Sequence, residues 1–154
     1  MNPPARLLGI YIAAGPTELP HAVERVRAVA GHGLEGDRYA EGAGTFSGNP
    51  GKRDVTLIEA EALESYERES GKKLSAAEAR RNLLTEGVRL NAFVGSEFQV
   101  GAVRLRGLRL SEPCTHLASL THPETLTGMA GRAGLIAEIL NDGELQVGDE
   151  ISEK

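Results

Sequence analysis

Glycine and proline divide this chain into short segments. Nineteen glycines and seven prolines are spread over 154 residues, whereas glycine usually makes up about 7% of a protein. Most stretches between these breaks are long enough for one short strand or one short helix. The chain shows no internal repeat and no block of like charge. A fold built from many short elements is therefore expected.

The segments between the breaks are mostly typical of β-strands. They are either continuously apolar or alternate between apolar and polar residues, as strands at a core do. Strands are predicted over Arg6–Ala14, His21–Ala30, Asp54–Ile58, Leu83–Val88, Glu97–Val100 and Val103–Leu110. The runs Leu135–Leu140 and Glu144–Val147 flank Asn141-Asp142-Gly143, and this combination predicts a β-hairpin.

Helical segments and one long loop interrupt the strands. Glu59–Ser70 contains helix formers and stops at Gly71, the residue type favoured just past a helix end. Ser75 and Glu78 have the spacing of a capping box, which predicts a second short helix. Residues 31–52 form a glycine-rich loop of a length that is usually functional or disordered. We expect a single domain over residues 1–154, mainly β with a few helices, as a compact β-barrel or curled sheet.

Charge and composition argue against several classes of protein. Lys and Arg number 17 against 22 Asp and Glu, for a net charge of −5, whereas a single-domain nucleic-acid binder usually has a basic face. No apolar run reaches the roughly 18 residues of a membrane span. The first residues lack the features of a signal peptide, and a single cysteine fits a reducing compartment. We therefore expect a cytoplasmic protein that binds neither nucleic acid nor membranes.

The only cysteine, Cys114, directly follows a predicted strand. It has no partner for an internal disulfide, so it is a buried apolar filler, a metal ligand or a reactive sulfur. Its neighbours from Ser111 to His116 are mostly polar, which favours a thiol outside the core. A zinc site with His116 and His122 is disfavoured, because structural zinc takes four ligands at characteristic spacings.

Two other segments have the chemistry of an anion site. Glycines in Gly31–Arg38 allow backbone N–H groups to converge on an anion, and Arg38 adds a bidentate donor. A tight turn that needs glycine is the alternative explanation. Arg80 and Arg81 end the second predicted helix and could clamp a phosphate or carboxylate, although arginines at a helix end are also simply solvated.

Two residues beside these cations complete the set of candidates. Asn82 follows Arg81 and offers both donors and an acceptor to the edge of a heterocycle. Arg53 stands at the start of the strand predicted from Asp54. Neither position identifies a ligand by itself.

Taken together and in order, these segments resemble the MOSC domain, the C-terminal domain of molybdenum cofactor sulfurases that also occurs as a stand-alone protein. The resemblance extends from about Ala28 to Ile151. Its matching segments are Gly33–Arg38, Arg53–Ile58, Arg80–Val88, Phe98–Gly101, Pro113-Cys114, Gly131–Leu135 and Val147–Glu150. Each segment is weak alone, but their order along the chain is specific.

The resemblance implies a β-barrel-like fold with a cysteine at the mouth of a pocket. Proteins of this family are associated with the molybdenum cofactor (molybdopterin), a pterin that carries a dithiolene and a phosphate. By resemblance, Cys114 either ligates molybdenum or carries sulfur as a persulfide. The candidate cofactor-binding residues are Arg80, Arg81 and Asn82, which match the segment that contacts the pterin or its phosphate, and Asp37, Arg38 and Arg53 in other matching segments.

Three functions follow from this reading. The first is a stand-alone MOSC protein that binds molybdenum cofactor or relays sulfur through Cys114, with a sulfur donor or an electron-transfer protein as partner. The second is a molybdenum-dependent reductase of N-hydroxylated compounds, and the third is a non-catalytic interaction module with a buried cysteine. Because the sequence has no pyridoxal phosphate domain, we expect it to receive sulfur and not to extract it from cysteine. Whether it is an enzyme, its substrate and its oligomeric state are left open.

Overall fold

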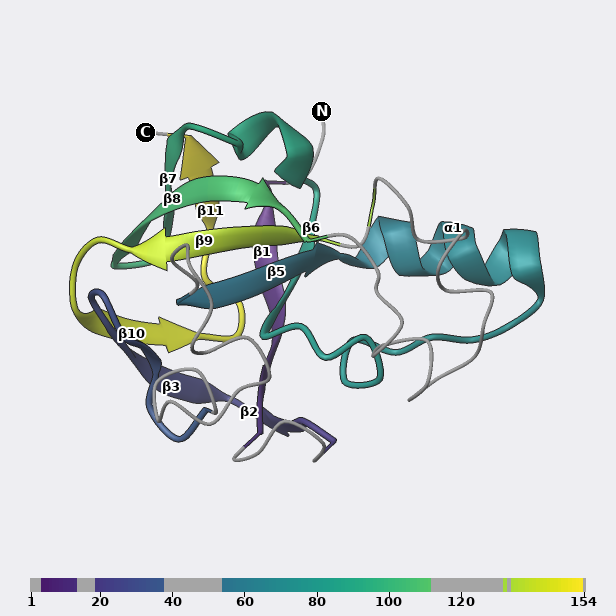
Figure 1. Cartoon of the computed structure of the whole chain (residues 1–154), viewed down its shortest axis with the longest axis horizontal. Coiled ribbons are helices and arrows are strands. Elements are labelled where there is room, and N and C mark those ends of the chain that lie inside the picture. The colour runs from purple at the N-terminus through teal and green to yellow at the C-terminus, as the bar shows by residue number, and fades with distance from the viewer. Residues whose placement is uncertain (1–3, 14–18, 38–53, 112–131, 133, 154) are drawn as a thin grey trace.

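The computed structural model describes residues 4–13, 19–37, 54–111, 132 and 134–153. Two sheets form its framework, one of eight strands in the order β11-β7-β8-β9-β5-β6-β1-β2 and one of three in the order β10-β3-β4 (Figure 1). The elements are β1 (Arg6–Ile12), β2 (His21–Val23), β3 (Arg25–Val29), β4 (Gly33–Leu34), β5 (Val55–Glu59), α1 (Ala60–Ser70), β6 (Leu83–Glu86), the 3-10 helix η1 (Leu90–Phe93), β7 (Glu97–Val100), β8 (Val103–Leu110), β9 (Leu135–Ile139), β10 (Gly143–Gln146) and β11 (Ile151–Glu153).

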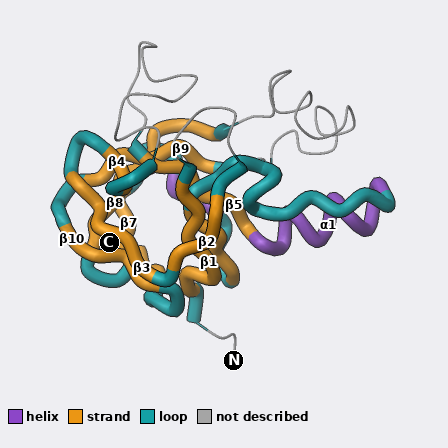
Figure 2. The backbone as a smooth tube through the Cα atoms, turned by 90° about the horizontal axis from the view of Figure 1, so that it is seen from below, coloured by secondary structure: helices purple, strands orange, loops and turns teal. Residues whose placement is uncertain are grey.

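The large sheet curls until β1 meets β11. Leu7 N–H donates to Asp149 O and Gly148 N–H donates to Leu7 O, both at 2.8 Å. Ile151 N–H donates to Ala5 O at the same distance. Viewed from below, the strands form a ring with α1 on its outside (Figure 2). The expected mainly β, barrel-like fold is therefore confirmed.

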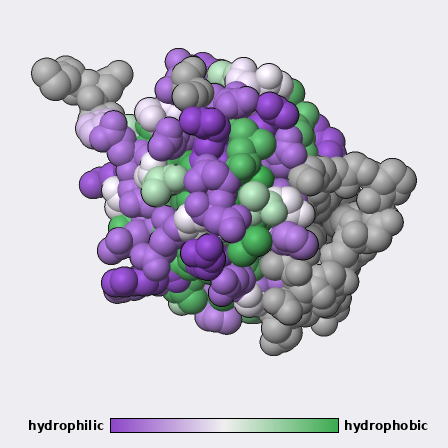
Figure 3. All heavy atoms as spheres, turned by 90° about the vertical axis from the view of Figure 1, so that its left-hand side faces the viewer, coloured by the Kyte–Doolittle hydropathy of each residue, from purple (hydrophilic) through white to green (hydrophobic). Residues whose placement is uncertain are grey.

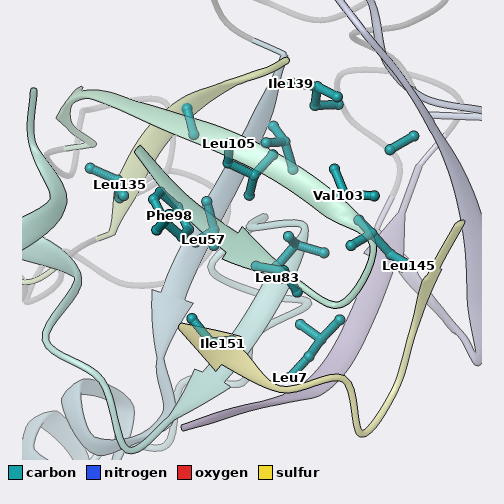
Figure 4. Close-up of a cluster of buried hydrophobic side chains, with 14 of the residues drawn as sticks. Leu7, Leu57, Leu83, Phe98, Val103, Leu105, Leu135, Ile139, Leu145 and Ile151 are labelled. Carbon is teal, nitrogen blue, oxygen red and sulfur yellow. The ribbon is translucent and has the colours of Figure 1, made fainter. Parts of the chain in front are cut away.

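Apolar side chains from nearly every strand fill the inside of the ring. Figure 4 shows them pointing toward one another from opposite walls, and those of Leu57, Leu83 and Leu105 have no exposed surface. Phe93 and Phe98 stack with ring centroids 4.4 Å apart. A smaller cluster lies beneath α1 and consists of Ile58, Leu63, Tyr66, Leu74, Ala76 and Ala79. Burial on this scale is what stabilises such a domain, at about 25 cal/mol for each Å² of apolar surface.

The predicted strands occur, with one subdivision. The run His21–Ala30 is divided at Glu24 into β2, which pairs with β1, and β3, which pairs with β10 and β4. The two strands thus belong to different sheets. Helix α1 also matches its prediction, and Gly71 follows it in the left-handed conformation (φ 73°). It connects β5 to β6, which are parallel.

The second predicted helix is wrong. The capping box does form, because Ser75 N–H donates to Glu78 Oε1 (3.0 Å) and Glu78 N–H donates to Ser75 Oγ (3.1 Å). The structure has only a single turn over residues 76–80. Arg80 then adopts a left-handed conformation, and this ends the turn before a helix can propagate.

The predicted hairpin between β9 and β10 is also wrong. Strand β9 pairs with β5 and β8, whereas β10 pairs with β3 in the other sheet. The turn residues bind elsewhere instead of closing a hairpin. Asn141 Oδ1 accepts a hydrogen bond from Arg104 N–H (2.7 Å), and Asp142 Oδ1 accepts one from Ala30 N–H (2.8 Å). An Asx-Gly sequence therefore marks a sharp turn here without pairing its flanks.

One face of the barrel can be viewed directly in Figure 3, which shows mostly hydrophilic side chains with hydrophobic ones in scattered patches. Arginines on β8 contribute to the polar surface, since Arg106 contacts Glu97 at 2.9 Å and Glu138 at 3.2 Å. Among the described residues, no helix is long and apolar enough to cross a membrane.

Candidate functional site

The candidate residues of the segment Arg80–Asn82 lie at the start of β6, beside the end of β1. Asn82 is 1% exposed, and its side chain bonds to both neighbouring strands. Its Oδ1 accepts hydrogen bonds from Thr56 N–H (3.0 Å) and Thr56 Oγ1 (3.1 Å), and its Nδ2 donates to Tyr11 O (3.1 Å). The Asn82 side chain therefore holds the beginnings of β5 and β6 against the end of β1.

Arg80 is a buried arginine in a backbone conformation that normally favours glycine. Its residue is 7% exposed and its φ is 61°. Arg81 N–H donates to Ala76 O (3.4 Å) and Arg80 N–H donates to Ala77 O (3.0 Å), which is the bond pattern of a Schellman motif with Arg80 in the usual glycine position. A left-handed residue with a side chain costs roughly 1–2 kcal/mol. Backbone strain of this kind is concentrated at functional sites. The Arg80 side chain is therefore a candidate functional group.

Arg81 extends from the same turn toward the end of β8 and the start of β9. Its Nη2 donates to Ser111 O at 3.3 Å. Gly134, which precedes β9, lies so close that an added Cβ would be 3.3 Å from Arg81 Nε and would collide with Leu57 O. Ser111 N–H in turn donates to Gly134 O (2.8 Å). Arg81 is thus fixed where the chain leaves β8 and where it re-enters the sheet.

Asp37 is fully buried, in the turn that follows β4. Its Oδ1 accepts a hydrogen bond from Ala13 N–H at 3.0 Å, and its own N–H donates to Leu34 O at 3.0 Å. Burial of a carboxylate requires such hydrogen bonds. The structure therefore gives Asp37 a role in joining this turn to the end of β1, and its predicted contact with a cofactor stays a prediction.

Two of the predicted segments meet at one place. Asp37 bonds to Ala13 and Asn82 bonds to Tyr11, so both lie at the C-terminal end of β1. The predicted site residues Arg38, Arg53 and Cys114 lie outside the described residues, as do His116 and His122. The expectation of a cysteine at the mouth of a pocket, with these cofactor-binding residues, therefore remains a prediction.

Sequence reasoning missed several residues that build this region. Thr56 stands in the sequence only as part of a predicted strand, yet it bonds to Asn82 through both its backbone and its hydroxyl. Asp54 is 3% exposed and its Oδ2 accepts a hydrogen bond from Ile139 N–H (2.9 Å). An aspartate immediately before a buried strand, next to Arg53, was the available signal. Ser111 and Arg132 carried no signal beyond their places beside Cys114 and in a matching segment.

The strand ends that carry Arg80, Arg81 and Asn82 do not line two cavities that described residues form elsewhere. A cavity of about 270 Å³ is lined by residues that include Ala5, Gly87 and Phe93, at the opposite ends of β1 and β6. Within the part of the chain that the structure describes, no group of three or more His, Cys, Asp or Glu side chains could hold a metal ion. The chemistry of the strand-end region is instead that of two arginines, which suit an anion.

The described residues thus form a mainly β domain, with a curled sheet and two adjacent arginines at its strand ends. The chain belongs to the MOSC domain family, whose model matches residues 43–152, more than half of the sequence. Similar solved structures share this fold. The YuaD protein from Bacillus subtilis matches with a TM-score of 0.81 at 17% identity, over 96% of this chain and 93% of that one.

Two structures of YiiM are also similar. The one from Geobacillus stearothermophilus has a TM-score of 0.74 at 15% identity and covers 98% of this chain and 75% of its own. The one from Escherichia coli has a TM-score of 0.71 at 18% identity and covers 97% and 69%. A search of curated proteins found no significant match. These structural likenesses establish the fold.

Proposed function

We propose that this chain binds the molybdenum cofactor through its strand-end arginines and uses Cys114 either as a ligand to molybdenum or as a persulfide carrier. The proposal combines the family membership, since MOSC domains are linked to this cofactor, with the chemistry of this chain's own residues. A cytoplasmic location and a sulfur donor or electron-transfer protein as partner belong to the same proposal.

The observation that carries the proposal is the buried, left-handed Arg80 beside Arg81. A dianionic phosphate that leaves bulk water needs charge-assisted donors, each worth roughly 1.5–3 kcal/mol. Two adjacent arginines at the end of a turn provide such donors, and guanidinium forks match phosphate oxygens. The cost of the left-handed backbone at Arg80 supports the view that function requires its side chain.

The position of Arg81 connects these cations to the cysteine. Arg81 donates to the carbonyl of Ser111, and Cys114 follows three residues later. Because three residues of extended chain span at most about 11 Å, a site that uses Cys114 would be within that reach of the Ser111 end of β8. A cation in that neighbourhood favours the thiolate, which is the form that binds metals and attacks sulfur.

The residues fit the cofactor by type. Arg80 and Arg81 would hold its phosphate, and Cys114 would offer a soft thiolate ligand. When bound, the cofactor supplies a dithiolene-held molybdenum that accepts a further sulfur ligand. Asn82 and Thr56 would act by keeping the strand ends, and therefore the arginines, in place.

Sulfur transfer to Cys114 needs no net oxidation. The Cys114 thiolate would attack the outer sulfur of a persulfide on a donor protein, forming a new S–S bond on Cys114. The S–S bond of the donor breaks at the same time, and the donor thiolate leaves with the electron pair. The proton of the persulfide stays with, or is lost from, the transferred sulfur.

The decisive experiment is to purify the protein gently from a host that makes the molybdenum cofactor and to measure molybdenum, cofactor phosphate and the mass of Cys114. Near-stoichiometric molybdenum that is lost in Cys114→Ser supports metal ligation. Persulfide on Cys114 without molybdenum supports sulfur relay. Neither molybdenum nor persulfide, with an unreactive thiol, would overturn the proposal and favour an interaction module.

Variants of the arginines test the anion clamp. Arg80→Ala and Arg81→Ala should lower retained cofactor, at least one of them by about tenfold, which corresponds to ~1.4 kcal/mol. Arg25→Ala is the matched control, because Arg25 is an exposed arginine on β3 that lies 3.9 Å from Glu144. Equal cofactor content in all three variants would remove the arginines from the proposal.

A further inference from the structure

The point where the chain re-enters the sheet before β9 is tied to the outer helix. Arg132 forms a two-pronged contact with Glu69, in which Nη1 donates to Oε2 at 3.2 Å and Nη2 donates to Oε1 at 2.8 Å. Glu69 belongs to the last turn of α1. Two parallel hydrogen bonds fix the direction of the guanidinium as well as its distance.

Glu69 is poorly placed for the helix itself. The C-terminal end of a helix carries partial negative charge, so a carboxylate there is unfavourable and a cation is preferred. The hydrogen bond from Arg132, and then its charge, hold the pKa of Glu69 below its usual value. The negative charge of Glu69 therefore stabilises the contact with Arg132 and does not stabilise α1.

Arg132 is linked in turn to the candidate site. It stands two residues before Gly134, whose carbonyl accepts the hydrogen bond from Ser111 N–H at 2.8 Å. Ser111 O accepts the hydrogen bond from Arg81. The connection therefore runs from Glu69 to Arg132 by the ion pair, along the chain to Gly134, and by hydrogen bonds through Ser111 to Arg81.

We propose that Glu69 and Arg132 are positioning residues for Arg81, one of the arginines of the proposed cofactor site. By holding the chain before β9 against α1, they keep Gly134 paired with Ser111. That pairing presents the Ser111 carbonyl to Arg81 and sets where the chain toward Cys114 begins. This inference rests on the proposed function for the importance of Arg81 and Cys114, but its physical content concerns only the contacts named above.

The test uses the protein without cofactor and takes advantage of its single cysteine. The variants are Glu69→Gln, Arg132→Gln and the charge swap Glu69→Arg with Arg132→Glu. Two quantities are measured at one fixed pH: the rate constant for alkylation of Cys114 by N-ethylmaleimide, and the exchange rate of the Ser111 amide hydrogen. Glu64→Gln, an exposed glutamate on the same helix, is the matched control.

Each single variant should speed exchange at Ser111 about three- to fivefold, as expected for loss of one well-formed exposed ion pair. The alkylation rate should change by a similar factor, and the charge swap should restore both. Urea midpoints should fall only slightly, because loss of the exposed pair lowers the stability against global unfolding by no more than the same small factor. Unchanged rates in the single variants, or failure of the swap to restore them, would overturn the inference. If both rates respond but the protein holds neither molybdenum nor persulfide, the proposed function fails and the positioning role stands.

Discussion

Asp37 and Asn82 bind the same strand end, although 45 positions separate them in the sequence. Asp37 Oδ1 accepts a hydrogen bond from Ala13 N–H, and Asn82 Nδ2 donates to Tyr11 O, two residues earlier. Both side chains are buried. Two segments that match the family pattern are thus joined through the end of β1, which gives the pattern a structural reason in addition to any role in binding.

The first prediction concerns Asp37. Asp37→Ala leaves the buried Ala13 N–H without its partner and should lower the free energy of unfolding by about 1–3 kcal/mol, measured by urea denaturation. Asp37→Asn keeps an acceptor oxygen and should lower it less. Asp142→Ala is the control, because Asp142 also accepts from a backbone N–H, that of Ala30, but is exposed. Equal losses at both sites would contradict the importance of burial.

Asn82 should be more sensitive than Asp37, because its side chain serves two strands. Asn82→Ala removes partners from Thr56 N–H and Tyr11 O and should destabilise the fold by roughly 2–6 kcal/mol, one unsatisfied group on each side. Thr56→Val removes only the hydroxyl and should have a smaller effect. Thermal and urea unfolding measure both variants. A stable Asn82→Ala protein would show that water replaces these bonds and that Asn82 does not organise the site.

Local pattern was enough to predict the strands and α1, but not which strands pair. Alternating apolar residues in Val103–Leu110 and the β-branched run before α1 identify β8 and β5, since each side chain faces either core or solvent. The Asn141-Asp142-Gly143 turn failed as a hairpin because its side chains bind Arg104 and Ala30. Such long-range bonds override local turn preferences and leave no trace in a short window of sequence.

The site could be predicted only as a set of residue types. Arginines beside an asparagine suggested an anion and a heterocycle, and the structure reveals that Asn82 bonds to Thr56 and Tyr11. The second helix failed because the capping box at Ser75 starts a turn that Arg80 ends. A left-handed arginine has no sequence signature, because glycine is the residue that usually announces this conformation.

Glu59 should make the stability of the protein depend on pH. Burial, followed by the nearby charge of Glu61, raises the pKa of Glu59 above its usual value of 4.5, although Leu90 N–H and Arg89 act in the opposite direction. A raised pKa means that the folded state holds the proton more tightly than the unfolded chain does. The stabilising contribution is therefore complete below 4.5 and is lost as the pH rises through the folded pKa.

Glu59→Gln should remove this dependence. The variant keeps an oxygen that can accept from Leu90 N–H, which lies 2.9 Å from Glu59 Oε2, but it carries no charge. Relative to the parent, it should gain stability as the pH rises from 4.5 through the raised pKa of Glu59, measured as the difference in unfolding free energy. Glu64→Gln serves as the exposed control. A constant difference between Glu59→Gln and the parent across this range would contradict the raised pKa.

Gly134 should tolerate no side chain. It has φ 121°, and a Cβ would collide with Leu57 O and crowd Arg81 Nε. Gly134→Ala should therefore destabilise the fold by about 1–3 kcal/mol through overpacking, in addition to the backbone cost. Gly71→Ala is the matched control, because Gly71 also has a positive φ but no heavy atom within 4 Å of its added Cβ. Similar unfolding free energies for the two variants would show that the backbone at Leu57 and the side chain of Arg81 move aside without cost.

The last prediction separates the strain at Arg80 from its proposed function. Arg80→Gly and Arg80→Ala both remove the guanidinium, so both should lose cofactor to the same extent. They should differ in stability, because a left-handed backbone destabilises alanine but not glycine. The free energy of unfolding, measured with urea, should therefore be higher for Arg80→Gly by about 1 kcal/mol. Arg80→Lys keeps a charge without the planar fork and should retain an intermediate amount of cofactor. Equal stability of the glycine and alanine variants would contradict the left-handed conformation, and undiminished cofactor content in both would leave the strain at Arg80 without a functional explanation.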